Sequence, residues 1–259
     1  MSPAAPTPTL PLTFSGGEAL VTGAASGIGA AISRMLMSAG VRTIRLDVRT
    51  PQPDPDHRAE LQAVAAIDVR EPALLERLNA IGAVPQRIAY LVNCAGVLDD
   101  TGFSGVSREI WMRCLEINVV GAYNTIDALT PLLRDASPAA VVNISSIEAG
   151  RVVALTDPDP TPQYAASKAA LQMLTQSAAR ALAADGVRVN SVSPGFVATP
   201  MAAPHGGTAT LPPTLACRVP AGRFADPADI ACAVAFLLSD QAGYITGSDL
   251  RVDGGFQLT

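Results

Sequence analysis

The sequence contains little histidine and almost no lysine, and both scarcities narrow the chemistry open to it. Its only histidines are His57 and His205, in polar or glycine- and proline-rich surroundings. A Ser-His-Asp hydrolase or a histidine-ligated metal site would have to use one of these two, so we expect neither. Of the 18 basic residues only one, Lys168, is lysine. It is either an accident of composition or a position that needs a compact ammonium.

Other absences bear on location and partners. No apolar run approaches the roughly 18 residues of a membrane span. Residues 1–8 lack the basic and apolar segments of a signal peptide. A formal net charge of −5 argues against binding to nucleic acid or to anionic membranes. Four scattered cysteines without a CxxC pattern indicate reduced thiols. We expect a cytoplasmic protein with a small-molecule substrate and no metal.

Alternating apolar strands and amphipathic helices indicate an α/β fold. The strands are continuously apolar, which is typical of a parallel sheet covered on both faces. We predict a flexible N-terminal arm over residues 1–17 and a single Rossmann-type doubly wound domain over 18–259. The strands are predicted at 19–22, 42–47, 63–68, 88–92, 139–145, 187–193 and 250–252, and the helices at 30–39, 71–81, 108–134, 164–185 and 227–239.

A glycine-rich segment lies between the first predicted strand and the first predicted helix. It reads Thr22-Gly23-x-x-x-Gly27-Ile28-Gly29. Such glycines let the backbone turn tightly and approach a pyrophosphate, which the helix N-terminus then attracts. A plain tight turn would explain the glycines alone. The strand before, the helix after and the acid Asp47, 18 residues beyond Gly29, together favour a dinucleotide site.

Asp47, at the end of the second predicted strand, predicts NAD as the cofactor. Its carboxylate can accept hydrogen bonds from both ribose hydroxyls of adenosine, and it would repel the 2′-phosphate of NADP. Arg45, expected on the same side of the sheet, and Arg49 are the opposing signal, because a nearby arginine can accept that phosphate. Neither the glycine-rich loop nor position 48 is basic, so NAD is favoured. An ordinary strand-end turn is the alternative role for Asp47.

Two further strand ends carry residues suited to a cofactor. Asp68 and Val69 end the third predicted strand, where a carboxylate could meet the adenine edge, although an ordinary turn explains them equally well. Residues 93–96, Asn-Cys-Ala-Gly, end the fourth strand. Small residues there would let a cofactor lie across the strand tips.

Tyr164 and Lys168 stand four residues apart, on one face of a predicted helix. The spacing alone is common, and its weight comes from the single lysine and from the serines at 145 and 146 upstream. A tyrosine pKa is ordinarily about 10. One ammonium at about 4 Å and an effective dielectric near 20 supplies roughly 4 kcal/mol. That suffices to lower the pKa by about 2–3. We therefore predict that Tyr164 takes the proton of an alcohol while hydride leaves to the cofactor. In the reverse reaction it returns a proton to the carbonyl oxygen as hydride arrives.

Together these motifs resemble those of the short-chain dehydrogenase/reductase family, from about residue 18 to residue 256. In order, they are TGxxxGIG at 22–29, NxAG at 93–96, Asn118, Ser146, Tyr164 with Lys168, Pro194-Gly195 and Asp253-Gly254-Gly255. The resemblance implies a seven-stranded parallel sheet with helices on both faces. It also implies a homotetramer that packs through the helices near 108–134 and 164–185. Two departures are Cys94, where the family usually has asparagine, and a longer interval between Ser146 and Tyr164.

The resemblance also implies roles for individual residues. Tyr164 would be the acid/base, Lys168 would bind the nicotinamide ribose and lower the tyrosine pKa, and Ser146 would hold the substrate oxygen. Ser145 is the alternative to Ser146, because the interval is longer than usual. Asn118 would hold a water in the proton relay. The implied cofactor contacts are Gly23, Ser26, Gly27, Ile28, Gly29, Asp47, Asp68, Val69, Asn93, Ala95, Gly96, Tyr164, Lys168, Pro194, Gly195, Val197 and Thr199.

We expect an uncharged, largely apolar substrate. Its pocket should be walled by residues 97–103, 147–155 and 197–217, and the last segment contains no Arg or Lys to meet a thioester cofactor or a phosphate. The prolines and paired glycines of 198–217 predict a substrate lid, or else a surface insertion without a role. Leu211 and Leu215 in it should contribute little to the core. Glu148 either binds a second substrate hydroxyl or faces solvent.

These features predict an NAD-dependent dehydrogenase of a secondary alcohol, alicyclic, terpenoid or steroid-like. The first alternative is an NADPH-dependent carbonyl or 3-oxoacyl reductase, which differs in cofactor preference. The second is a non-catalytic dinucleotide-binding or regulatory protein. Retention of Ser146, Tyr164 and Lys168 argues against the second, because binding alone needs no acid/base tyrosine.

Overall fold

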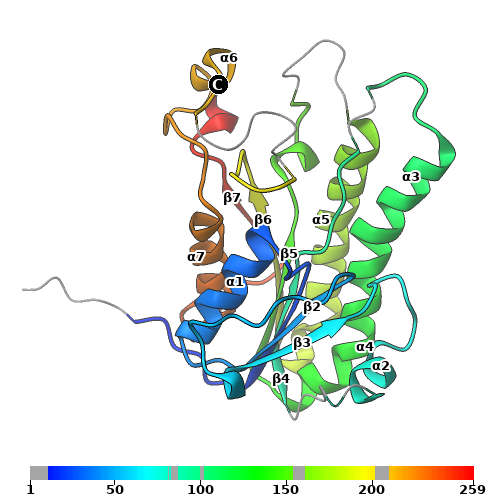
Figure 1. Ribbon diagram of the computed structural model, residues 1–259, viewed down its shortest axis with the longest axis vertical. Helices are drawn as coiled ribbons and strands as arrows, with labels where there is room; N and C mark the ends of the chain where they lie inside the picture. Colours follow the sequence, from blue (N-terminus) through cyan, green and yellow to red (C-terminus); the bar gives the residue numbers. More distant parts are fainter. Residues whose placement is uncertain (1–10, 81, 83–86, 100–101, 154–160, 202–209) are drawn as a thin grey trace, which may run out of the picture.

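Seven parallel strands form the centre of the molecule (Figure 1). The computed structural model describes residues 11–80, 82, 87–99, 102–153, 161–201 and 210–259. The strand order is β3-β2-β1-β4-β5-β6-β7, so the order reverses between β1 and β4. The strands are β1 (Glu18–Thr22), β2 (Thr43–Asp47), β3 (Gln62–Ala66), β4 (Ile88–Asn93), β5 (Ala139–Ile144), β6 (Val187–Pro194) and β7 (Asp249–Val252).

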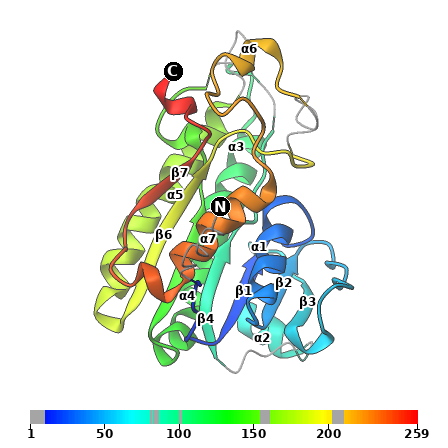
Figure 2. The same cartoon turned by 90° about the vertical axis from the view of Figure 1, so that its left-hand side faces the viewer.

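Helices cover both faces of this sheet, as Figures 1 and 2 show. One face packs against α1 (Gly27–Ser38) and α7 (Pro227–Leu238). The other packs against α2 (Leu74–Ala80), α4 (Gly121–Asp135) and α5 (Pro162–Leu182). The central strands are therefore buried on both sides, with every residue of β4 and β5 buried. This is the doubly wound architecture predicted from the continuously apolar strands.

The helix predicted over 108–134 is divided into three parts. It consists of α3 (Arg108–Leu115), a π-helix (Glu116–Val120) and α4. A π-turn takes in one extra residue per turn and often marks a functional position. Here it carries Asn118, whose side chain is 1% exposed. In the ranges that the structure describes, no helix is long and apolar enough to cross a membrane.

Short helices complete the fold, and several of them follow the carboxyl ends of the strands. The 3-10 helix Ile147–Ala149 follows β5, and α6 (Pro213–Ala216) follows β6. Beyond β7, the chain ends in the 3-10 helix Phe256–Leu258. Three further 3-10 turns lie at Ala59–Leu61, Ala183–Asp185 and Asp240–Ala242.

Residues 13–17, predicted as part of a loose arm, are instead held against the domain. The hydroxyl of Thr13 donates to Asp240 at 2.7 Å, and that of Ser15 donates to the same carboxylate at 2.9 Å. The Gly16 amide donates to the Tyr90 hydroxyl at 2.8 Å. Polar side chains in this segment thus meet partners that are more than 70 residues away, which composition alone does not reveal. Residues 1–10 of the predicted arm lie outside the described residues.

Leu211 and Leu215 are buried, contrary to the expectation that they contribute little to the core. They are 9% and 5% exposed and pack with Ile147, Val219 and Phe256 in a separate apolar cluster above the sheet. The cluster forms because the segment after β6 folds back onto the C-terminal turn. Residues 202–209 of the predicted lid lie outside the described residues.

Candidate active site

A long cleft of about 970 Å³ follows the carboxyl ends of the strands. This is the edge where ligands bind in doubly wound sheets, next to the point where the strand order reverses. The volume lies within the range of small-molecule and cofactor sites. All of the predicted site residues except Asn93 and Asn118 line the cleft: Gly23, Ser26, Gly27, Ile28, Gly29, Asp47, Asp68, Val69, Ala95, Gly96, Ser146, Tyr164, Lys168, Pro194, Gly195, Val197 and Thr199.

The glycine-rich turn is the tightest part of the cleft wall. Gly23 has φ +66°, and a Cβ atom there would lie 2.8 Å from the Ala95 backbone nitrogen. Any side chain would therefore close the turn against the loop after β4 and obstruct the cleft between them. The turn leads into the N-terminus of α1, whose first backbone N–H groups have no partner within the helix. Geometry and donors both suit a pyrophosphate.

Asp47 lies at one end of the cleft and fixes the same turn. One carboxylate oxygen accepts from the Ala25 amide at 3.1 Å, and the other accepts from the Arg49 amide at 3.1 Å. An ionised carboxylate has about four acceptor positions, so both oxygens can also accept from a ligand. The Arg49 guanidinium is 4.0 Å away and largely exposed. The carboxylate therefore remains a suitable acceptor for ribose hydroxyls.

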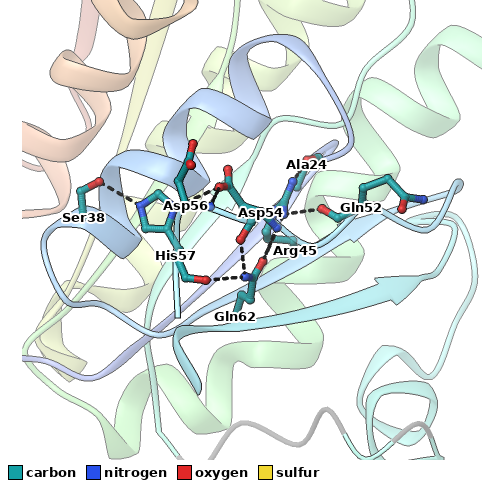
Figure 3. A network of polar contacts seen from close by, with 8 residues as sticks. All are labelled: Ala24, Ser38, Arg45, Gln52, Asp54, Asp56, His57 and Gln62. Atoms are coloured by element: carbon teal, nitrogen blue, oxygen red, sulfur yellow. Dashed lines mark hydrogen bonds and ion pairs between the residues drawn. The ribbon is translucent and has the colours of Figure 1, made fainter. Parts of the chain in front are cut away.

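Arg45, two residues before Asp47 on β2, does not line the cleft. Its guanidinium is buried and donates to the carbonyls of Gln52 at 2.7 Å and Ala24 at 3.3 Å (Figure 3). Burial lowers its pKa, and the nearby Asp54 carboxylate raises it. Arg45 thus supports the glycine-rich turn from behind and does not line the cleft.

His57 belongs to the same network and does bring a serine and an aspartate together. Its ring nitrogens lie 3.0 Å from the Ser38 hydroxyl and 3.2 Å from Asp54 Oδ1 (Figure 3). Ser38 is exposed at the C-terminal end of α1, where the available backbone groups are carbonyls. A serine nucleophile needs N–H donors for its oxyanion, so this position does not suit hydrolysis. His57 therefore does not form such a site, and His205 lies outside the described residues.

Asp68 lines the cleft, but its carboxylate already binds an arginine that the sequence reasoning missed. Arg70 Nη2 donates to it at 2.6 Å and Arg70 Nε at 3.0 Å. The hydrogen bond from the Arg70 side chain is the main cause that lowers the pKa of Asp68. The signal was present in the sequence, since an arginine two residues after a strand-end aspartate can fold back onto it. This part of the cleft wall thus presents an ion pair.

Lys168 and Tyr164 lie together at the other end of the cleft, on α5. The Lys168 ammonium is 5% exposed, donates to the Ile144 carbonyl at 2.8 Å and lies 5.6 Å from the centre of the Tyr164 ring. Burial lowers the pKa of Lys168 to about 8. Desolvation raises the pKa of Tyr164, the Glu148 carboxylate raises it further, and a hydrogen bond with Ser146 lowers it.

The protein groups around Tyr164 together raise its pKa, and the influence of Lys168 stays a prediction. The sequence argument counted one ammonium and neglected the loss of hydration around the phenol. It also could not place Glu148, whose negative charge opposes a phenolate. Tyr164 consequently holds its proton at neutral pH.

Ser145 and Ser146 differ in direction, as alternation along a strand predicts. The Ser145 hydroxyl donates to the Lys168 carbonyl at 3.2 Å and so supports α5. Ser146 accepts from the Glu148 amide at 3.2 Å and hydrogen-bonds Tyr164. Of the two serines, Ser146 is therefore the one that approaches the reactive tyrosine.

The side chains of Asn93 and Asn118 are buried behind the cleft wall, and the contacts of these residues with cofactor and water stay predictions. Asn93 donates to the Asn143 side chain at 2.9 Å and accepts from Thr125 at 2.6 Å. Asn118 accepts from the Val97 amide at 2.9 Å and donates to the Ser167 hydroxyl at 2.9 Å. Both side chains face inward, where buried amides require internal partners. They position the cleft and do not line it.

The substrate end of the cleft is mainly apolar. Of the residues that the sequence placed there, Val97, Leu98, Ile147, Val153, Met201 and Leu215 line it. Phe103 and Val152 are 70% and 67% exposed and lie outside the lining, as does the buried Leu211, and Leu155 lies outside the described residues. Arg113 and Thr161 also line the cleft and were missed. Arg113 is paired with Asp99 at 3.0 Å.

Fold and cleft define a dinucleotide-binding α/β protein. A model of the family described as "Enoyl-(Acyl carrier protein) reductase" matches residues 23–257. The chain is 38% identical over 259 residues to (3R)-3-hydroxyacyl-CoA dehydrogenase of Rattus norvegicus, with 92% of this chain and 95% of that protein covered. The chain belongs to the short-chain dehydrogenase/reductase family and is an oxidoreductase.

Solved structures of similar fold contain either nicotinamide dinucleotide. A 3-ketoacyl-(acyl-carrier-protein) reductase from Brucella melitensis complexed with NADH has a TM-score of 0.82 at 26% identity, covering 94% of this chain and 99% of that one. A structure from Agrobacterium tumefaciens with bound NADP has a TM-score of 0.80 at 29% identity, covering 97% of this chain and all of that one. These likenesses extend to the dinucleotide class and leave the choice between NAD and NADP to the residues of this chain.

Proposed function

We propose that the protein is an NAD-dependent dehydrogenase that interconverts a secondary alcohol and a ketone. One observation carries the proposal: Ser146, Tyr164 and Lys168 converge at the apolar end of a cleft whose other end holds the glycine-rich turn and Asp47. A bound nicotinamide would accept or donate the hydride. The three side chains are suited to hold the substrate oxygen and exchange its proton.

Tyr164 is the acid/base in this proposal. Its raised pKa means that it carries a proton at neutral pH and can donate it to a ketone oxygen as hydride arrives. Alcohol oxidation needs the phenolate, so we expect its rate to increase with pH. Lys168 is proposed to bind the nicotinamide ribose and to favour the phenolate by its charge. Ser146 is proposed to hold the substrate oxygen beside the phenol.

Two observations favour NAD over NADP. The Asp47 carboxylate lines the adenosine end of the cleft and would repel a 2′-phosphate. Arg45, the buried candidate for binding that phosphate, is committed to the carbonyls of Ala24 and Gln52. A glutamine in place of Asp47, or an arginine without partners behind the glycine-rich turn, would instead have favoured NADP.

The alternative is an NADPH-dependent 3-oxoacyl reductase. Arg49 lines the cleft, is largely exposed and could bind a 2′-phosphate. Arg113 also lines the cleft and could place a positive charge near the substrate. Relatives named for acyl-CoA and acyl-carrier-protein substrates belong to the same family. The pairing of Arg113 with Asp99 and the apolar walls favour a small, largely apolar alicyclic, terpenoid or steroid-like substrate.

We further propose a cytoplasmic homotetramer. Exposed apolar side chains on α3, the π-helix, α4 and α5 support self-association through these helices, and they are Met112, Val120, Tyr123 and Met173. Light scattering at micromolar concentration tests the assembly, and a monomer would contradict it.

Steady-state assays with NAD and with NADP test the activity across cyclic and aryl secondary alcohols and 3-oxoacyl thioesters. We expect oxidation of apolar cyclic alcohols with NAD and a higher kcat/KM for NAD than for NADP. A higher kcat/KM for NADPH together with a 3-oxoacyl thioester would instead establish the alternative.

A further inference from the structure

Glu148 is a carboxylate in an otherwise largely apolar part of the cleft. It lies on the 3-10 helix Ile147–Ala149, two residues after Ser146, and it lines the cleft together with Ile147, Val153 and Leu215. The hydroxyl of Thr161, which also lines the cleft, donates to Glu148 Oε2 at 2.7 Å. Thr161 is 6% exposed and directly precedes α5, three residues before Tyr164. The carboxylate is therefore held in a fixed position near the acid/base tyrosine.

This position has an adverse effect on the chemistry. The charge of Glu148 raises the pKa of Tyr164 and so opposes the phenolate that alcohol oxidation needs. A glutamine could accept the same hydrogen bond from Thr161 without that charge. What distinguishes the carboxylate from a glutamine is its charge, which the hydrogen bond from Thr161 holds at the apolar wall of the cleft.

An ionised carboxylate can only accept hydrogen bonds, and it offers about four acceptor positions. With this number of positions, the carboxylate can accept a ligand hydroxyl in addition to its partners in the protein, of which Thr161 is one. Hydrogen bonds to charged groups are the stronger ones, and they discriminate best where the surroundings are apolar. A site built to bind a substrate hydroxyl strongly rejects an analogue that lacks it.

We propose that Glu148 determines substrate specificity by accepting a hydrogen bond from a second hydroxyl, so that the enzyme acts on an alicyclic diol or hydroxyketone. This inference rests on the proposed oxidoreductase function and names its substrate class. One hydroxyl is oxidised at Ser146 and Tyr164, while the other binds Glu148. The rest of the ring contacts the apolar wall.

The test compares cyclohexanediols with methylcyclohexanols in which a methyl group replaces the second hydroxyl at the same ring position and stereochemistry. The parent enzyme should have a higher kcat/KM for at least one diol than for its methyl analogue. Glu148→Gln should lower that ratio roughly three- to tenfold, because a neutral amide oxygen accepts a weaker hydrogen bond than a carboxylate does. Glu76→Gln, at an exposed position of α2 outside the cleft lining, is the matched control and should leave the ratio unchanged.

A pH profile provides a second readout that a merely structural role would not move. The groups that influence Tyr164 are Glu148 from the 3-10 helix, Cys114 from α3 and Cys94 after β4, with Lys168 beside it on α5. Removing the Glu148 charge lowers the pKa of Tyr164, so the rising limb of alcohol oxidation should move to lower pH in Glu148→Gln. Thr161→Val releases the Glu148 carboxylate but keeps its charge. It should lower the ratio of kcat/KM for the diol to that for its methyl analogue, without moving the rising limb of alcohol oxidation to lower pH.

The outcomes separate this inference from the proposed function. If the parent oxidises diols and their methyl analogues equally well with NAD, the role of Glu148 is wrong while the dehydrogenase proposal stands. If no alcohol is oxidised, the dehydrogenase proposal fails, and calorimetry of diol binding in the presence of NADH then decides on Glu148. Equal diol affinity of parent and Glu148→Gln would overturn the inference. If Glu148→Gln does not fold, Glu148→Asp, with its shorter reach, must lower the diol ratio in its place.

Discussion

Replacement of Asp47 by alanine should reverse the cofactor preference. The variant loses the acceptor for two ribose hydroxyls, each charge-assisted bond being worth about 1.5–3 kcal/mol. Water replaces part of this, so we expect a net loss of about 2–3 kcal/mol, or roughly 30- to 150-fold in the Kd for NADH. For NADPH the change is favourable, because a charge pair at about 5 Å and an effective dielectric near 20 repels by about 3 kcal/mol. The exposed Arg49 guanidinium, 4.0 Å from the lost carboxylate, would then face the phosphate.

The Kd values of NADH and NADPH can be measured by the fluorescence of the reduced nicotinamide. Asp56→Ala removes an exposed carboxylate from the segment that follows Asp47 and serves as the control. The variant also loses the hydrogen bonds that Asp47 accepts from the amides of Ala25 and Arg49. This loss loosens the turn equally for both cofactors, so it cancels in the ratio of the two Kd values. An unchanged ratio of the two Kd values would remove Asp47 from the adenosine site and refute the reasoning.

Three further predictions follow from burial. Lys168→Arg should lower kcat at least about a hundredfold in steady-state assays, because a planar guanidinium does not fit where the buried ammonium donates to a strand carbonyl. A near-parental kcat would disprove this. Leu215→Ala should lower the free energy of unfolding by about 2–4 kcal/mol in urea titrations, whereas Leu258→Ala, 80% exposed, should change it little. Iodoacetamide at pH 8 should leave Cys94 unmodified, because burial raises its pKa to about 12, while exposed Cys232 should react. Mass spectrometry locates the modified cysteines, and alkylation of Cys94 first would contradict the assigned environment.

The sheet and the position of the cleft could be predicted because local patterns determine them. Continuous apolar strands such as β4 and β5 require helices on both faces, and strand-end residues of parallel strands meet at one edge. Asp47, Ser146, Tyr164 and Lys168 were therefore brought together as expected. The exact bounds of helices differed by a few residues, since capping and the π-turn depend on tertiary contacts.

The sequence did not reveal features that depend on contacts between distant segments. Arg45 turns behind the glycine-rich loop because residues 52–62 fold over it and supply carbonyl and amide partners. The inward orientation of Asn93 depends on partners on α4 and β5. Leu215 is buried because the segment after β6 meets the C-terminal turn. None of these contacts leaves a periodic signal in the sequence.

The surroundings of Tyr164 could not be predicted for a different reason. The Coulomb energy between Tyr164 and Lys168 depends on their separation, which their spacing on one helix face predicts. Desolvation depends on everything that surrounds the phenol, and Glu148 comes from another element. The sequence therefore indicated the candidate catalytic side chains but could not describe their environment.

The burial of Lys168 has a consequence for covalent chemistry at the surface. It is the only side-chain amine of the protein, and only 5% of it is exposed. Guanidinium groups do not react with acylating reagents under conditions that modify amines, so the arginine-rich exterior offers no lysine for acetylation, isopeptide linkage or amine cross-linking. Side-chain amine modification of the folded protein must therefore take place inside the cleft, and its extent would report directly on whether the cleft is open.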